Sequence, residues 1–153
     1  MSTQLERHLK TDDIKKFASD YISNGLRQER WQIDEVSILN KQLSAVVSMQ
    51  SHYTSGQDNL GFHLSSFSAK EFCAQLMVLY AHVQQGFSEK TREVWVVEGR
   101  IRCVRPIRNP SKIEVNMTML AVRQRAGKAF CIADFLVSDS QGGLFKISMK
   151  VII

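Results

Sequence analysis

The chain has 153 residues, of which 44% are hydrophobic and 23% charged, and its formal net charge is +5. This length and composition predict a single domain, residues 1–153, with a core of its own, and they argue against a disordered or repetitive chain. The polar start predicts no signal peptide, and no apolar run is long enough for a membrane span. Three widely spaced cysteines, Cys73, Cys103 and Cys131, lie in apolar stretches and predict buried free thiols in the reducing cytoplasm.

The N-terminal region predicts an amphipathic helix. Residues 1–10 form a polar arm, and Thr11-Asp12-Asp13 is a helix start because acidic groups favour the first turn. Apolar residues then follow at helical spacing as far as Ile22, and Asn24-Gly25 ends the segment.

After Trp31 the hydrophobic period changes from helix to strand. Alternating residues predict two strands that are joined at Asn40-Lys41-Gln42, followed by a loop over residues 52–66 that is rich in Ser, Gly, Asn and Asp. Beyond Gly86 every element alternates, and we expect a meander of four strands: Val94–Ile107, a strand from Ile113 to about Met119, Ala129–Val137 and Leu144–Ile152.

Residues 67–85 predict one long helix between these two groups of strands. Ser68 and Glu71 have the spacing of a capping box, and Gly86 supplies a stop in the left-handed conformation. The helix is apolar on nearly all sides, so protein should enclose it. One polar stripe remains, formed by Glu71, Gln75 and His82.

Burial then suggests the architecture, which belongs to the α+β class. A helix that is apolar on most sides needs a curved antiparallel sheet wrapped around it. Because one sheet closes only part of its girth, we expect a second copy of the chain to cover some of the rest, which predicts a homodimer or a dimer of dimers.

Two stretches resemble enzymes of the hotdog fold that act on acyl thioesters. The segment Phe67-Ser-Ala-Lys-Glu71 is similar to the helix opening of the FcoT-like thioesterase branch, where Asn stands in place of Ser68. Arg100-Ile-Arg-Cys-Val-Arg-Pro106 is similar to the strand that follows in that branch. The Glu71-x-x-x-Gln75 spacing and His52-Tyr-Thr-Ser-Gly56 also partly match the beta-hydroxyacyl-ACP dehydratases. The resemblance implies a dimer that binds an acyl thioester with its reacting carbonyl at the helix N-terminus.

The candidate catalytic residues gather around that terminus. Glu71 could act as a general base beside Ser68, where the positive end of the helix can stabilise an oxyanion, and Gln75 lies one turn further along. His63 and His52, in the preceding loop, are candidate proton carriers. For each residue a structural role is also open: a cap for Glu71 and a solvated loop position for the histidines.

Further residues are candidates for ligand binding. Asn59, with Asp58, could position water, and Tyr80 lies deeper along the helix. A basic row could receive the phosphates of coenzyme A or the acidic surface of an acyl carrier protein, unless it is only a solvated sheet face. This row comprises Arg100, Arg102, Arg105, Arg108 and Lys112.

The sequence therefore favours a thioesterase that acts on acyl-CoA or acyl-ACP in fatty acid or polyketide metabolism. A beta-hydroxyacyl thioester dehydratase that uses His52 or His63 with Glu71 is the second hypothesis, and a non-catalytic dimeric binding module is the third. No cofactor is expected. No His or Cys ligands have metal-site spacing, and no aromatic residues interleave with the arginines as in nucleic-acid binding.

Overall fold

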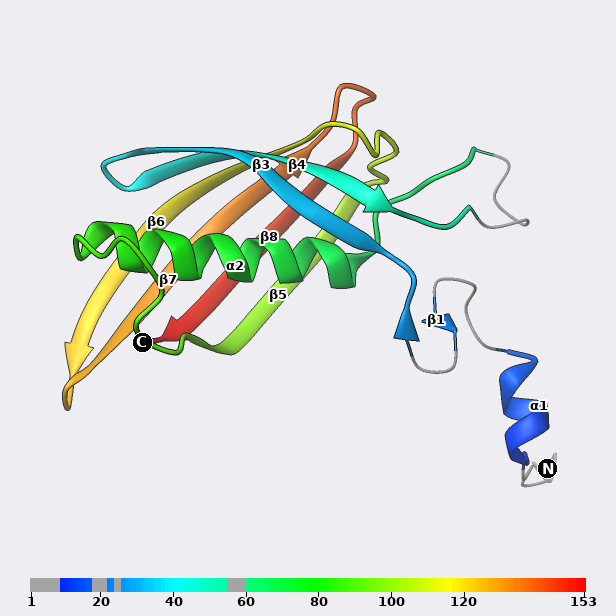
Figure 1. The fold of residues 1–153 in the computed structure, drawn as a ribbon, viewed down its shortest axis with the longest axis horizontal. Helices are drawn as coiled ribbons and strands as arrows, with labels where there is room; N and C mark the ends of the chain where they lie inside the picture. The colour runs from blue at the N-terminus through cyan, green and yellow to red at the C-terminus, as the bar shows by residue number, and fades with distance from the viewer. Residues whose placement is uncertain (1–8, 18–21, 24–25, 55–59) are drawn as a thin grey trace, which may run out of the picture.

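A computed structural model describes residues 9–17, 22–23, 26–54 and 60–153. Figure 1 shows its elements in chain order. The elements are α1 (Thr11–Lys15), β1 (Ile22–Ser23), β2 (Leu26–Arg27), β3 (Arg30–Leu39), β4 (Gln42–Ser51), α2 (Ser66–Gln84), β5 (Trp95–Arg105), β6 (Ile113–Arg125), β7 (Lys128–Ser138) and β8 (Leu144–Ile152).

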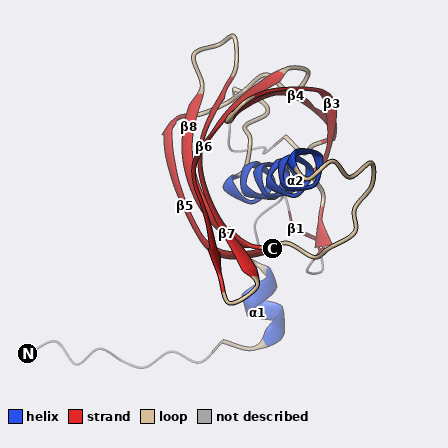
Figure 2. Cartoon of the chain, turned by 90° about the vertical axis from the view of Figure 1, so that its left-hand side faces the viewer, coloured by secondary structure: helices blue, strands red, loops and turns tan. Residues whose placement is uncertain are grey.

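One antiparallel sheet of six strands curves around α2, with the strand order β3-β4-β6-β7-β8-β5 (Figure 2). Alternation along the strands explains which face is concave. On β6, for example, Ile113, Val115 and Met117 are buried while the residues between them are exposed. Phe72, on α2, packs into the core that these side chains form. The predicted curved sheet around a long helix is confirmed.

The prediction of a four-strand meander after the helix is wrong. Strands β6, β7 and β8 are consecutive neighbours, but β5 pairs with β8 at the edge of the sheet, with Ile101 opposite Ile147. The place beside β4 is taken by β6, where Val47 pairs with Ile113. Helix α2 crosses the concave face of the sheet and connects β4 to β5, which lies at the opposite edge (Figure 1). The next strand, β6, lies beside β4 again.

The start of α2 differs from the predicted capping box. Ser65 is the N-cap, and its Oγ accepts a hydrogen bond from the Ser68 backbone N–H at 3.2 Å. The Ser68 hydroxyl donates instead to Glu29, and the Glu71 carboxylate accepts from residues of the N-terminal part of the chain. Tertiary partners thus replace the local reciprocal bonds that the spacing suggested.

The end of α2 is as predicted. Gly86 has φ +76°, and its N–H donates to Val83 O at 3.0 Å. The Phe87 N–H donates to His82 O at 3.1 Å. These two bonds form a Schellman motif, which requires the left-handed backbone that glycine adopts without strain.

Two further predictions need correction. The described N-terminal helix α1 has only five residues, none of them buried, so the long amphipathic helix is not confirmed, and Ile22 lies in the two-residue strand β1. Residues 18–21 of that prediction lie outside the described part of the chain. Cys73 and Cys131 are buried, but Cys103 is exposed because it lies on the edge strand β5, most of which α2 leaves uncovered. None of the helices in the described ranges is long and apolar enough to cross a membrane.

Candidate functional site

A groove of about 410 Å³ lies between the first half of α2 and the edge of the sheet at β5. Its sheet side is apolar, because Val96 and Gly99 of β5 and Met149 of β8 share the concave face. A Cβ added to Gly99 would meet no atom within 4 Å, so this glycine leaves open space in the groove. Its other lining residues are Arg27, Phe67, Lys70, Glu71 and Ala74.

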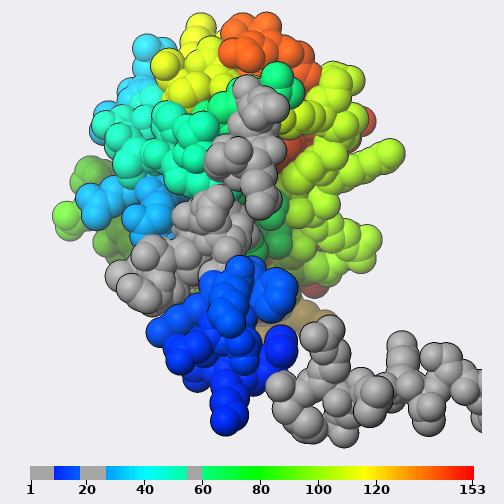
Figure 3. Space-filling model, turned by 90° about the vertical axis from the view of Figure 1, so that its right-hand side faces the viewer, coloured from blue at the N-terminus to red at the C-terminus, as the bar shows by residue number. Residues whose placement is uncertain are grey.

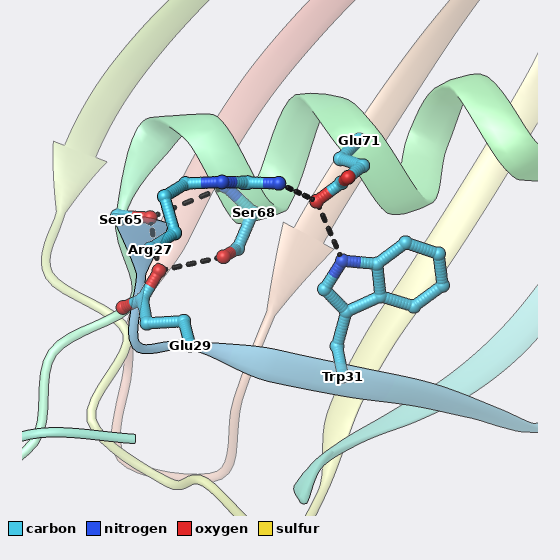
Figure 4. Close-up of polar contacts among 6 residues, drawn as sticks. All are labelled: Arg27, Glu29, Trp31, Ser65, Ser68 and Glu71. Carbon is cyan, nitrogen blue, oxygen red and sulfur yellow. Dashed lines mark hydrogen bonds and ion pairs between the residues drawn. The ribbon is translucent and has the colours of Figure 1, made fainter. Parts of the chain in front are cut away.

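Glu71 lies in this groove and is held through one carboxylate oxygen (Figure 4). Its Oε2 accepts hydrogen bonds from Arg27 Nη2 at 2.6 Å and from Trp31 Nε1 at 2.9 Å. Among the described residues, none donates to Oε1. Partial burial raises the pKa of Glu71, but the two hydrogen bonds and the charge of Arg27 outweigh it, so the pKa lies below its ordinary value. Glu71 is therefore ionised at neutral pH, with one oxygen still able to accept a proton.

Glu29 forms a second carboxylate cluster at the start of α2 (Figure 4). This residue is only 6% exposed, and its Oε2 accepts from Ser65 Oγ at 2.5 Å and from Ser68 Oγ at 2.6 Å. The other oxygen, Oε1, is buried without a partner among the described residues. These two hydrogen bonds tie Glu29 to the first turn of α2.

Sequence reasoning missed Arg27, Glu29 and Trp31. They lie about 40 residues before their partners, at the point where the chain enters β3. The one available signal was the strand pattern at Trp31, which places an indole N–H at the sheet edge but does not say what it faces.

Of the predicted catalytic residues, Ser68 and Glu71 do lie together at the start of α2, but Ser68 is buried and engaged with Glu29. Gln75 is exposed and lines a different hollow, nearer the end of α2. The ring of His52 lies 4.8 Å from that of Phe62, and the ring of His63 lies 6.3 Å from that of Tyr53. Within the described ranges, no hydrogen bond joins either histidine to Glu71.

Figure 3 views the end of the molecule at which α2 begins, with β5 on its right-hand side. The predicted water-positioning residues Asn59 and Asp58, in the loop before α2, lie outside the described residues. Tyr80 lies further along the helix, where its hydroxyl donates to Asn40 O at 2.9 Å. His82 is buried, with Nδ1 at 2.8 Å from Val78 O and Nε2 accepting from the Arg92 N–H. These contacts give Tyr80 and His82 structural roles at the far end of α2.

The predicted basic row does not face the groove. Arg100 and Arg102 pair with Ser148 and Lys146 of β8, on the face of the sheet opposite Gly99. Arg100 forms an ion pair with Glu98 at 3.0 Å. Of the rest, Arg105 donates to Gly142 O, Lys112 pairs with Glu114, and Arg108 lies in the loop after β5.

Asp139 braces the loop that supports the start of α2. Its Oδ2 accepts from the backbone N–H groups of Arg108 and Asn109, and its Oδ1 accepts from those of Gln141 and Gly143. Burial raises the pKa of Asp139, but the four N–H bonds outweigh it and hold the pKa below its ordinary value. In this braced loop, Ile107 O accepts a hydrogen bond from the N–H of Leu64, which lies just before α2, at 2.9 Å.

The arrangement supplies an ionised carboxylate, an apolar trough and the positive end of a helix, which together suit chemistry on a carbonyl. Within the described residues, no group of three or more His, Cys, Asp or Glu side chains is placed to hold a metal ion.

Comparisons with known proteins identify the fold. No family model and no curated protein matches the sequence. Among solved structures, the chain is similar to the conserved protein PA5202 from Pseudomonas aeruginosa (TM-score 0.57, 11% identity, 80% of this chain and 86% of that one). It is also similar to the dehydratase heterocomplex ApeI:P from Xenorhabdus doucetiae (TM-score 0.55, 15% identity, 78% of this chain and 80% of that one). A third similar structure is a hypothetical thioesterase from Streptococcus pneumoniae with coenzyme A (TM-score 0.51, 10% identity, 80% of this chain and 86% of that one). The chain has the hotdog fold that thioesterase and dehydratase structures share.

Proposed function

We propose that this protein hydrolyses acyl thioesters. The observation that carries the proposal is Glu71, an ionised carboxylate with Oε1 available, at the polar end of an apolar groove. A groove of about 410 Å³ is within the range of small-molecule sites. The apolar side chains along the sheet suit an acyl chain, and Glu71 lies where its carbonyl would meet the first turns of α2.

In this reaction Glu71 Oε1 takes a proton from water, and the water oxygen bonds to the thioester carbonyl carbon. The negative charge that develops on the carbonyl oxygen is stabilised by the positive end of α2. When the intermediate collapses, the carbon–sulfur bond breaks and the proton on Glu71 passes to the departing thiolate. The products are a carboxylic acid and a free thiol, and Glu71 is again ionised.

We further propose that the carrier is coenzyme A or an acyl carrier protein and that the active form is a homodimer in the cytoplasm. Strand β5 supports a dimer, since its outer edge has no strand partner among the described residues. Trp95 is 67% exposed and Val97 is 50% exposed on this edge. An exposed apolar edge strand favours pairing with another chain. A second copy here would also close the open side of the groove.

The test is release of free thiol from a panel of acyl-CoAs of different chain length. We expect turnover by the wild type and a loss of at least about a hundredfold in Glu71→Gln, as for removal of a general base. Glu114→Gln is the matched control, because Glu114 is exposed on the outer face of the sheet. If no chain length is hydrolysed, or if Glu71→Gln equals the wild type, the proposal is wrong.

The same panel separates the alternatives. Loss of water from a 3-hydroxyacyl-CoA without thiol release would identify a dehydratase and would direct attention to His52 and His63. Saturable acyl-CoA binding without any turnover would identify a binding module.

A further inference from the structure

Lys70 lines the groove but has no ion-pair partner among the described residues. Its neighbour in the groove, Arg27, is engaged with Glu71 at 2.6 Å. Lys70 is the fifth residue of α2, and the first turn of that helix contains no acidic residue. The macrodipole disfavours a cation this close to a helix N-terminus, and an anion bound beside Lys70 would offset that cost.

The charges that line the groove are unbalanced. Two cations, Arg27 and Lys70, face one carboxylate, Glu71, and the remaining surface is largely apolar. An occupant that complements this groove has one negative charge beside Lys70 and an apolar body against Val96, Gly99 and Met149. A nucleotide phosphate group fits less well, because several negative charges would meet one uncommitted cation and the nearby Glu71.

We propose that the groove binds a free fatty acid, with its carboxylate paired to Lys70 and its chain along Gly99. This inference rests on the proposed function only for the origin of the acid, since a fatty acid is what hydrolysis of an acyl thioester would leave in the groove. The carboxylate and Glu71 repel one another, and Lys70 offsets that repulsion. The protein would then retain its acid product and be inhibited by it.

The experiment is calorimetric titration of the full chain with sodium octanoate and, separately, with 1-octanol, which has the same chain length and no charge. We expect octanoate to bind about tenfold more tightly than octanol, the gain of one charge-assisted contact. Lys70→Gln should lose about this factor for octanoate and leave octanol unchanged. Lys70→Arg should keep the preference, because it keeps the charge.

Two other variants complete the design. Lys112→Gln removes a lysine that pairs with Glu114 away from the groove, so it should bind both probes like the wild type. Gly99→Leu fills the open space and should weaken both probes alike. Equal binding of octanoate and octanol, no binding of either, or an effect of Lys70→Gln no larger than that of Lys112→Gln would overturn the inference. Because no thioester is used, these results are independent of whether the protein hydrolyses acyl-CoA.

Discussion

Replacing Asp139 by Asn tests the brace that supports the start of α2. The carboxylate accepts four backbone N–H groups, two on each oxygen, at 2.7 to 3.1 Å. An amide keeps one acceptor oxygen but turns its NH₂ group towards two of these donors. Two N–H groups that are at least partly buried then lose their partner, at about 1–3 kcal/mol each. We expect Asp139→Asn to lower the free energy of unfolding by roughly 2–6 kcal/mol at pH 7, a large part of the stability of an ordinary domain.

The measurement is urea denaturation at several pH values, followed by circular dichroism. Because the folded-state pKa of Asp139 is lowered, its contribution is fully present above the unfolded pKa of about 3.9 and is lost as the pH falls through the folded pKa. The difference in the free energy of unfolding between the wild type and Asp139→Asn should therefore become smaller in acid. Asp134→Asn, an exposed position on β7, the strand that ends just before Asp139, is the control and should change stability by less than about 0.5 kcal/mol. The reasoning would be refuted if Asp139→Asn lost less than about 0.5 kcal/mol of stability, like the control. It would also be refuted if the difference in the free energy of unfolding between Asp139→Asn and the wild type stayed constant below about pH 4.

Three other predictions follow from single contacts. Arg27→Gln removes a charge that lowers the pKa of Glu71, so this pKa should rise. The acid limb of a pH–rate profile should then move to higher pH, and an unchanged limb would mean that Arg27 does not act on Glu71. Gly143→Ala places a Cβ 2.6 Å from Ile107 Cα, so we expect a loss of about 1–3 kcal/mol in thermal or chemical denaturation, whereas Gly127→Asn, where φ is +74° and space is open, should cost much less. Val97→Lys should shift the protein from dimer to monomer in sedimentation, because a charge on edge strand β5 discourages pairing; a dimer that persists would place the interface elsewhere.

Local signals predicted much of the fold. The hairpin turn is at Asn40, whose φ of 56° suits a residue that tolerates the left-handed region, and Gly86 ends α2 where expected. Strand neighbours were not predictable in the same way, because alternation shows which side chains share a face but not which strand lies alongside. That is why β5 was placed in a meander and is found beside β8.

The candidate site was predictable only in part. Glu71 stood out because a polar stripe on an apolar helix needs an explanation, and it does line the groove. The N-cap is Ser65 and not the predicted Ser68, whose hydroxyl donates to Glu29, a residue distant in sequence that no local pattern connects to the helix. The partners of Glu71 were hidden for the same reason, since Arg27 lies in a two-residue strand with no hydrophobic pattern.

Arg27, which lines the groove, comes from outside the six-stranded sheet and α2 that form most of its walls. Arg27 belongs to β2, which pairs with β1 and not with the six-stranded sheet. Part of the acidity of Glu71 is thus separable from the architecture: exchanging residues 22–27 should leave the curved sheet around α2 in place and raise the pKa of the carboxylate, while Trp31 of β3 keeps its own hydrogen bond to Glu71. Chains that share this wrap but begin differently should therefore differ in the pH at which they work.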